Sequence, residues 1–263
     1  MAMRASWRTT KRWKSTSHHY QQLPHNIRSL LRQTAQPVAV VTSVMPPDAS
    51  SPSHRFHGAT LSSFTSISLA PHPLVAFSLR VPSRMATTLS GLATTSSTTT
   101  ISSHSTSHMV INILSAAQAH AARLFSRPDL HPRPFDAHEV IWSETRDGLP
   151  ILHGSLGALS CRVVGAAWPL SDLNALVRGG EMEEGGEQPS WVVDGVASEL
   201  FIARIVHVED IPLEGTDPSD TLRTLPLLYH RQDYTTVSVP PDLKPNSSRE
   251  IVDDLLDLVG KKC

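Results

Sequence analysis

The segment that most constrains the fold of this 263-residue chain runs from His57 to Phe77 and reads HGATLSSFTSISLAPHPLVAF. Small hydroxyl residues are interleaved with apolar ones in its first half, and an apolar strand follows Pro73. The hydroxyls are those of Thr60, Ser62, Ser63, Thr65, Ser66 and Ser68. A buried strand has no use for so many hydroxyls, whereas hydroxyls and backbone N–H groups can bind the edge of a flat heterocycle and its phosphate. The segment therefore predicts a ligand-binding surface built on a strand and a loop.

Composition excludes several other classes of protein. The formal net charge is −1, so the chain has no global electrostatic preference for nucleic acid or acidic lipid. No run of eighteen apolar residues occurs, which excludes a transmembrane helix. The two cysteines, Cys161 and Cys263, make neither a disulfide framework nor a metal site and suggest a reducing compartment. The fourteen histidines are scattered without metal-ligand spacing, so we expect no metal.

The N-terminus is basic and free of acids, because the first acidic residue is Asp48. Residues 1–20 combine this charge with serines and threonines and lack an apolar core, which is typical of a mitochondrial transit peptide rather than a secretory signal. The alternative is a disordered basic tail. We expect a soluble protein of the mitochondrial matrix.

Periodicity predicts few helices and many short strands. Helices are expected at 26–33, with Asn26 as N-cap, at 115–126 with Ser115 as N-cap, and at 247–259, where residues 251, 255, 256 and 259 form an apolar face. Strands are expected at 38–44, 74–79, 109–114, 159–164, 200–208 and 235–239. The Ser/Thr-rich tract 87–108 is interpreted as a mobile insertion, and 178–189 as a Gly/Glu-rich hairpin.

These elements favour a mainly β fold, a Greek-key barrel crossed by one helix. No G-x-G-x-x-G follows a strand, which argues against a Rossmann dinucleotide site.

Gly58 to Val75 resembles the signature G-x-T-x-x-S-F-T-S-V-S-L-x-P-P-L-V of flavin reductase-like, FMN-binding split-barrel proteins. Ile67, Ala70 and one extra residue in 71–73 depart from it. Three later blocks, 110–125, 148–161 and 226–234, also resemble the family in the expected order. The resemblance spans about residues 28–237. It implies a Greek-key split β-barrel with a few peripheral helices at 21–240. The insertions near 87–108 and 178–190 and the C-terminal amphipathic helix extension at 241–263 are predicted from the sequence pattern itself.

The resemblance implies FMN as cofactor, with FAD as the alternative, NAD(P)H as co-substrate, and a homodimer with the flavin at its interface. Hydride would pass to flavin and on to free flavin, oxygen or an unidentified partner protein. The implied flavin contacts are Thr60, Ser62, Ser63, Phe64, Thr65, Ser66, Ile67, Ser68, Ser83, Arg84 and Asn112. Ser83 and Arg84 stand where the family contacts the phosphate, and a guanidinium pairs well with phosphate. Three of these residues have structural alternatives: Phe64 as core, Arg84 as an exposed, solvated arginine, and Asn112 as a turn cap.

The nicotinamide side departs from the family, in which many members carry a G-D-H histidine where this chain has Ser198. The other nicotinamide-side candidates are Tyr234, which matches the family's closing tyrosine, and His230. The missing histidine leaves a second hypothesis open, a non-catalytic split-barrel module that binds flavin weakly or not at all. A heme-binding or pyridoxamine-phosphate-oxidase-like barrel is a weaker third.

The basic N-terminus generates a localisation prediction. Residues 1–40 fused to a fluorescent reporter should direct it to mitochondria, because an acid-free basic segment is what the import machinery reads. A reporter that stays in the cytosol would contradict the transit peptide.

Overall fold

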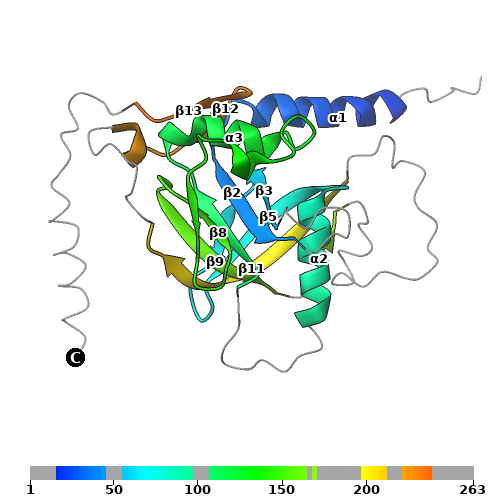
Figure 1. Cartoon of the computed structure of the whole chain (residues 1–263). Helices are drawn as coiled ribbons and strands as arrows, with labels where there is room; N and C mark the ends of the chain where they lie inside the picture. Colours follow the sequence, from blue (N-terminus) through cyan, green and yellow to red (C-terminus); the bar gives the residue numbers. More distant parts are fainter. Residues whose placement is uncertain are drawn as a thin grey trace, which may run out of the picture.

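The structure is a computed structural model that describes residues 16–45, 55–96, 107–164, 168–170, 197–211 and 221–238 (Figure 1). The predicted hairpin at 178–189 and the predicted helix at 247–259 lie outside these residues. These residues include three α-helices, α1 (Thr16–Leu31), α2 (Arg84–Ser96) and α3 (Ala119–Ser126). Short 3₁₀ turns are η1 (Ala116–Gln118), η2 (Pro134–Asp136) and η3 (Thr221–Thr224). Among the described helices, none has the length and apolar character needed to cross a bilayer.

The strands form one large antiparallel sheet and two small ones. The large sheet has the order β3 (Phe56–Leu61), β2 (Ala39–Val44), β6 (Met109–Ile113), β9 (Gly157–Val163), β11 (Ala197–Glu209), β5 (Leu74–Val81), β4 (Thr65–Ser68), with β10 (Trp168–Pro169) paired to β11. The small sheets are β1 (Gln36–Pro37), β12 (Leu228–His230) and β13 (Asp233–Thr235), and β7 (Trp142–Glu144) with β8 (Pro150–Leu152).

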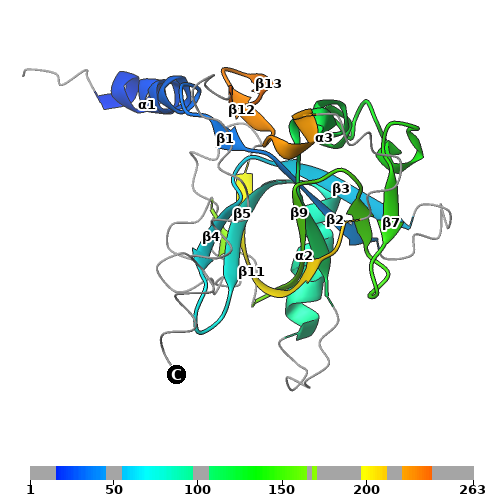
Figure 2. The ribbon, with the colours of Figure 1, turned by 90° about the vertical axis from the view of Figure 1, so that its left-hand side faces the viewer.

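The large sheet curls around a single apolar interior (Figure 2). Phe77 on β5 and Phe201 on β11 face each other across the paired strands and stack at 5.6 Å between ring centroids. Both rings are fully buried. The prediction of a mainly β split barrel with a few peripheral helices is confirmed.

Helix α2 contradicts the interpretation of residues 87–96 as a mobile tract. Its buried side chains, among them Met85, Leu89 and Ala93, lie on one face and pack into the barrel core. Ser83 caps the helix, because its Oγ accepts the Ala86 N–H at 3.1 Å. The many threonines conceal this apolar stripe from a composition-based reading, and residues 97–106 lie outside the described part.

The predicted helix at 115–126 is confirmed as η1 followed by α3, which packs on the outer side of β3. Thr60 donates its hydroxyl to the Ala122 carbonyl at 2.7 Å. The predicted start of the first helix at Asn26 was wrong, since α1 already begins at Thr16.

A polar side chain joins three strands inside the sheet layer. Asn112 on β6 is fully buried. Its Nδ2 donates to the Val40 carbonyl at 3.2 Å, and its Oδ1 accepts the Leu152 N–H at 2.8 Å. The Asn112 amide therefore links β6 to β2 and β8. It neither caps a turn nor lies on the surface.

The closest glycine contact lies between β3 and α3 and generates a stability prediction. A Cβ added at Gly58 would meet the Phe125 ring at 2.5 Å, and that ring is held edge-on by Phe135 at 5.0 Å. We expect Gly58→Ala to lower the free energy of unfolding by about 1–3 kcal/mol through overpacking.

The matched control is Gly91→Ala in α2, where a Cβ meets nothing within 4 Å. This variant should be neutral or stabilising by up to about 1 kcal/mol through helix propensity. Urea unfolding of both variants measures the contrast, and equal stabilities would refute the packing argument.

Candidate functional site

The hydroxyl segment lies along one edge of β5. Thr65 pairs with Ala76 and Ser66 with Val75 across the β4–β5 ladder. One step further along, Ser63 Oγ accepts the Ser78 N–H at 2.9 Å and donates to the Ser78 carbonyl at 3.2 Å. The segment is not one strand, because the chain bends between β3 and β4 and the register shifts between Ser66 and Ser68. Ser62, Phe64, Ser66 and Ser68 therefore do not share one face of a single strand.

The side chains of this segment divide into exposed and inward-facing groups. Ser62, Ser63, Thr65 and Ser66 are exposed, and Ile67 is 49% exposed beside them. We call this surface the hydroxyl edge. Phe64 instead packs against the barrel core, which agrees with its structural alternative. Ser68 donates to the Ala70 carbonyl at 3.1 Å, and Thr60 faces α3.

Ser83 and Arg84 lie at the far end of β5, where α2 begins. The first turn of α2 holds no acidic residue, and the Arg84 side chain is exposed there. The positive end of a helix dipole and a guanidinium together attract a phosphate. The two predicted phosphate residues thus occupy a corner with the chemistry of an anion site.

Ser198 lies on the other side of β5 from the hydroxyl edge, at the same end as Arg84. It pairs with Arg80 in the β5–β11 ladder, and its carbonyl accepts the Leu170 N–H at 2.8 Å. The strand therefore places Ser198 near the corner made by Ser83 and Arg84.

Tyr234 and His230 belong to a different sheet, the β12–β13 hairpin beside β1. Tyr234 packs edge-on against Tyr229 at 5.6 Å, and the Arg123 guanidinium lies 5.5 Å from the ring. Burial raises the pKa of Tyr234 above its usual range. Within the described protomer these two candidates are not gathered with Ser198.

His57 lies near Arg84 and is not among the site residues predicted from the sequence. It lies on β3, and burial, followed by the nearby Arg84 charge, lowers its pKa from 6.5 to about 4. The imidazole is therefore neutral at pH 7. Its position directly before the motif glycine, Gly58, is the only sequence signal that marks it.

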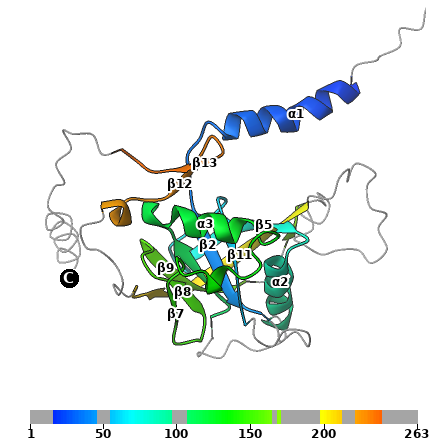
Figure 3. The same cartoon turned by 45° about the horizontal axis from the view of Figure 1, so that its top comes forward.

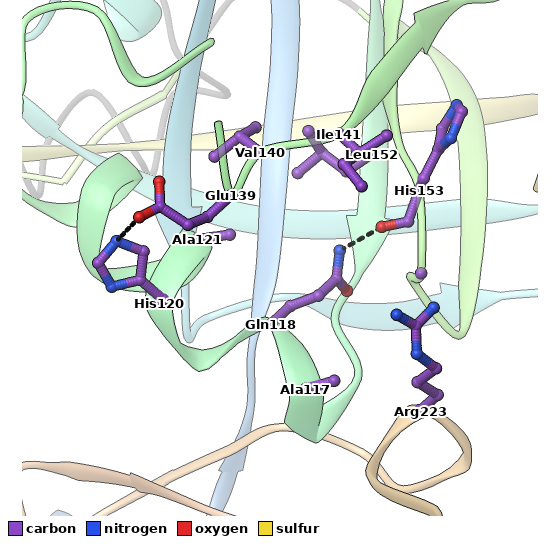
Figure 4. A pocket seen from close by; sticks show the side chains of 11 residues that line it. Ala117, Gln118, His120, Ala121, Glu139, Val140, Ile141, Leu152, His153 and Arg223 are labelled. Atoms are coloured by element: carbon purple, nitrogen blue, oxygen red, sulfur yellow. Dashed lines mark hydrogen bonds and ion pairs between the residues drawn. The ribbon is translucent and has the colours of Figure 1, made fainter. Parts of the chain in front are cut away.

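A separate cavity of about 270 Å³ lies between η1, the start of α3, β8 and η3 (Figure 4). Gln118 reaches across it, accepting the Ser115 N–H at 3.0 Å and donating to the His153 carbonyl at 2.9 Å. His120 and Glu139 approach to 3.8 Å at its rim. None of the residues that line it belongs to the predicted site.

The protein is a split antiparallel barrel. Its exposed hydroxyl edge runs along β5 toward Ser83 and Arg84 at the start of α2. Residues 31–238 match the model of the flavin reductase like domain, and the chain belongs to that family.

Solved structures share the fold at low identity. The homologue of nitrilotriacetate monooxygenase component B from Mycobacterium thermoresistibile is 21% identical, with a TM-score of 0.53, over 88% of this chain and 96% of that one. The NADH:FAD oxidoreductase SgcE6 of Streptomyces globisporus C-1027, in complex with NAD and FAD fragments, is 20% identical, with a TM-score of 0.51 over 84% and 95%. The flavin reductase PheA2 is 21% identical, with a TM-score of 0.50 over 82% and 98%.

The depressed pKa of His57 generates a pH prediction. Between pH 6.5 and about 4, His57 is protonated in the unfolded chain but stays neutral in the folded chain. Stability attributable to this residue is therefore lost as pH falls through that window, with a slope approaching about 1.4 kcal/mol per pH unit. Above pH 6.5 His57 is neutral in both the folded and the unfolded chain, so stability no longer depends on pH through this residue.

Urea unfolding at several pH values should show a shallower acid destabilisation for His57→Gln than for the wild type. The exposed His131, substituted in the same way, is the control and should leave the slope unchanged. Parallel curves for wild type and His57→Gln would contradict the buried neutral imidazole.

Proposed function

We propose that this protein is an FMN-dependent flavin reductase that passes a hydride from NAD(P)H to flavin, with FAD as the alternative flavin. One observation carries the proposal: the family match over residues 31–238 includes an exposed hydroxyl edge that leads along β5 to the start of α2. Both parts of this surface have the chemistry that a flavin nucleotide needs.

The residues present fit a flavin nucleotide. Ser62, Thr65 and Ser66 offer exposed hydroxyls and backbone groups to the polar edge of the ring system. Ser83 and Arg84 would hold the phosphate at the α2 N-terminus, with no acidic residue in that turn to repel it. Ile67, half exposed, offers apolar contact beside them. We do not assign a flavin contact to Asn112, because its amide is engaged in the core.

A bound flavin would supply hydride acceptance, while the chain supplies binding and alignment. Such a transfer depends on orientation more than on acid–base residues. The residues of this chain therefore need only hold the two ring systems in place, and Ser198, beside Arg80, is the proposed nicotinamide-side residue of β11. His57, half-buried near Arg84, is neutral and adds no positive charge at pH 7.

Tyr234 and His230 remain proposed nicotinamide-side residues through a second copy of the chain, since their hairpin lies in another sheet. This role agrees with the proposed homodimer. Use of a nicotinamide nucleotide is supported by the similar SgcE6, whose structure holds NAD and FAD fragments. The acceptor beyond flavin is proposed as free flavin, oxygen or a partner protein, in the mitochondrial matrix.

A second candidate function is a non-catalytic flavin-binding or interaction module. Ser198 favours it, because this position lacks the imidazole that the family often carries there. The two functions differ in whether the bound flavin is reduced.

The test is anaerobic reduction of the purified protein loaded with FMN. Addition of NADH or NADPH should bleach the absorbance of oxidised flavin at a catalytic rate. Flavin that binds but stays oxidised with both nucleotides would reject the reductase and support the module. Failure to bind either FMN or FAD would likewise overturn the reductase and leave a module that acts without flavin.

The phosphate corner generates an affinity prediction. Arg84→Gln should weaken FMN binding by about tenfold or more, since loss of a charge-assisted hydrogen bond costs about 1.5–3 kcal/mol. Riboflavin, which has no phosphate, should bind wild type and variant equally. Arg127→Gln is the matched control, because Arg127 is an exposed arginine on the C-terminal side of α3. An unchanged FMN affinity in Arg84→Gln, measured by fluorescence titration, would remove Arg84 from the site.

A further inference from the structure

Helix α1 leaves the barrel with an apolar stripe uncovered. Figure 3 shows it projecting outward from the base formed by β12 and β13. Its stripe consists of Leu23, Ile27, Leu30 and Leu31, which are 53%, 45%, 68% and 49% exposed. These positions are spaced i, i+4, i+7 and i+8, so they share one face of the helix. Four large apolar side chains in one row indicate a contact surface.

The charge of α1 limits the kind of segment that can dock on the apolar stripe. The helix carries Arg28 in its last turn, Arg32 follows it directly, and no acidic residue occurs before Asp48. An occupant should therefore be amphipathic and acidic.

The chain itself contains a segment with these properties. Residues 247–259 read SSREIVDDLLDLV and lie outside the described residues. Ile251, Leu255 and Val259 of the predicted apolar face, together with the adjoining Leu258, repeat the i, i+4, i+7, i+8 spacing of the stripe. The acidic residues Glu250, Asp253, Asp254 and Asp257 outnumber the single Arg249. This segment matches α1 in apolar spacing and opposes it in charge.

The fold brings the two segments within reach. The β12–β13 hairpin is tied to the end of α1, because Arg231 N–H donates to the Arg32 carbonyl at 3.0 Å and Arg231 Nε to Gln33 Oε1 at 3.1 Å. The described chain continues from this hairpin to residue 238. The nine steps from 238 to 247 span up to about 30 Å. The stripe from Leu23 to Leu31 is only about 12 Å long.

We propose that residues 247–259 form an acidic amphipathic helix that docks on the apolar stripe of α1 in the same chain. The docked pair would bury both stripes and place the acids of one segment in the positive field of the other. The C-terminal extension then acts as a cover for the N-terminal helix. This docking does not depend on flavin binding or turnover.

Hydrogen–deuterium exchange of the full-length protein tests the proposal through the amides of residues 22–31. The wild type should protect these amides, and Leu255→Asp/Leu258→Asp should accelerate their exchange at least about tenfold by removing the cover. Leu243→Asp, an apolar-to-acid change outside the segment, is the control and should leave exchange as in the wild type. The reciprocal Leu30→Asp should expose the amides of 249–259.

Each other outcome rejects the docking. Unprotected α1 amides in the wild type, or protection that survives the double substitution, would overturn it. Protection that grows with protein concentration would assign the stripe to a second copy instead. Thermal unfolding of the variants, expected to match the wild type for these exposed positions, shows that the barrel remains folded.

Discussion

The register of β5 is the constraint on which the candidate site depends. Val75, Phe77 and Leu79 point into the barrel and are buried, which fixes which residues of the strand face outward. A slip by one residue would bury Ser78 and Arg80 and expose the phenyl ring, so the core allows one register only. That register sets Ser63 and Thr65 on one side of the strand and Ser198 on the other. The end of β5 places Ser83 and Arg84 at the start of α2. The buried apolar side chains of β5 therefore fix the position of the polar surface.

Electrostatics at the end of β5 follow from burial as well. His57 is neutral at pH 7 because desolvation lowers its pKa to about 4. At pH 7 the positive character of this corner therefore comes from Arg84 and the α2 N-terminus, with Arg80 at the end of β5, and not from His57. An imidazolium near the Arg84 guanidinium would add a repulsive charge that must be desolvated, whereas the neutral ring adds none.

The sequence predicts the barrel and its strands well, because alternating or continuous β-branched runs such as 38–44 and 109–114 carry their own signal. Prediction from the sequence fails where tertiary contacts determine the local structure or the role of a residue. Helix α2 is specified by buried Met85, Leu89 and Ala93, which a threonine-rich composition conceals. Asn112 is polar and precedes a helix, so it resembles a cap or a ligand, yet its amide links buried strands. The motif residues were predicted as a set. Only the fold separates the exposed Ser62, Thr65 and Ser66 from Thr60, which bonds to α3, and Phe64, which packs against the barrel core.

The most direct test of the central claim is a crystal structure of the protein grown with FMN. The account predicts the ring system against the hydroxyl edge, Ser62 to Ile67, and the phosphate within hydrogen-bond distance of Ser83 and Arg84. A flavin seated elsewhere, for instance in the cavity between Gln118 and Arg223, would contradict the account even if the protein proved to be a reductase.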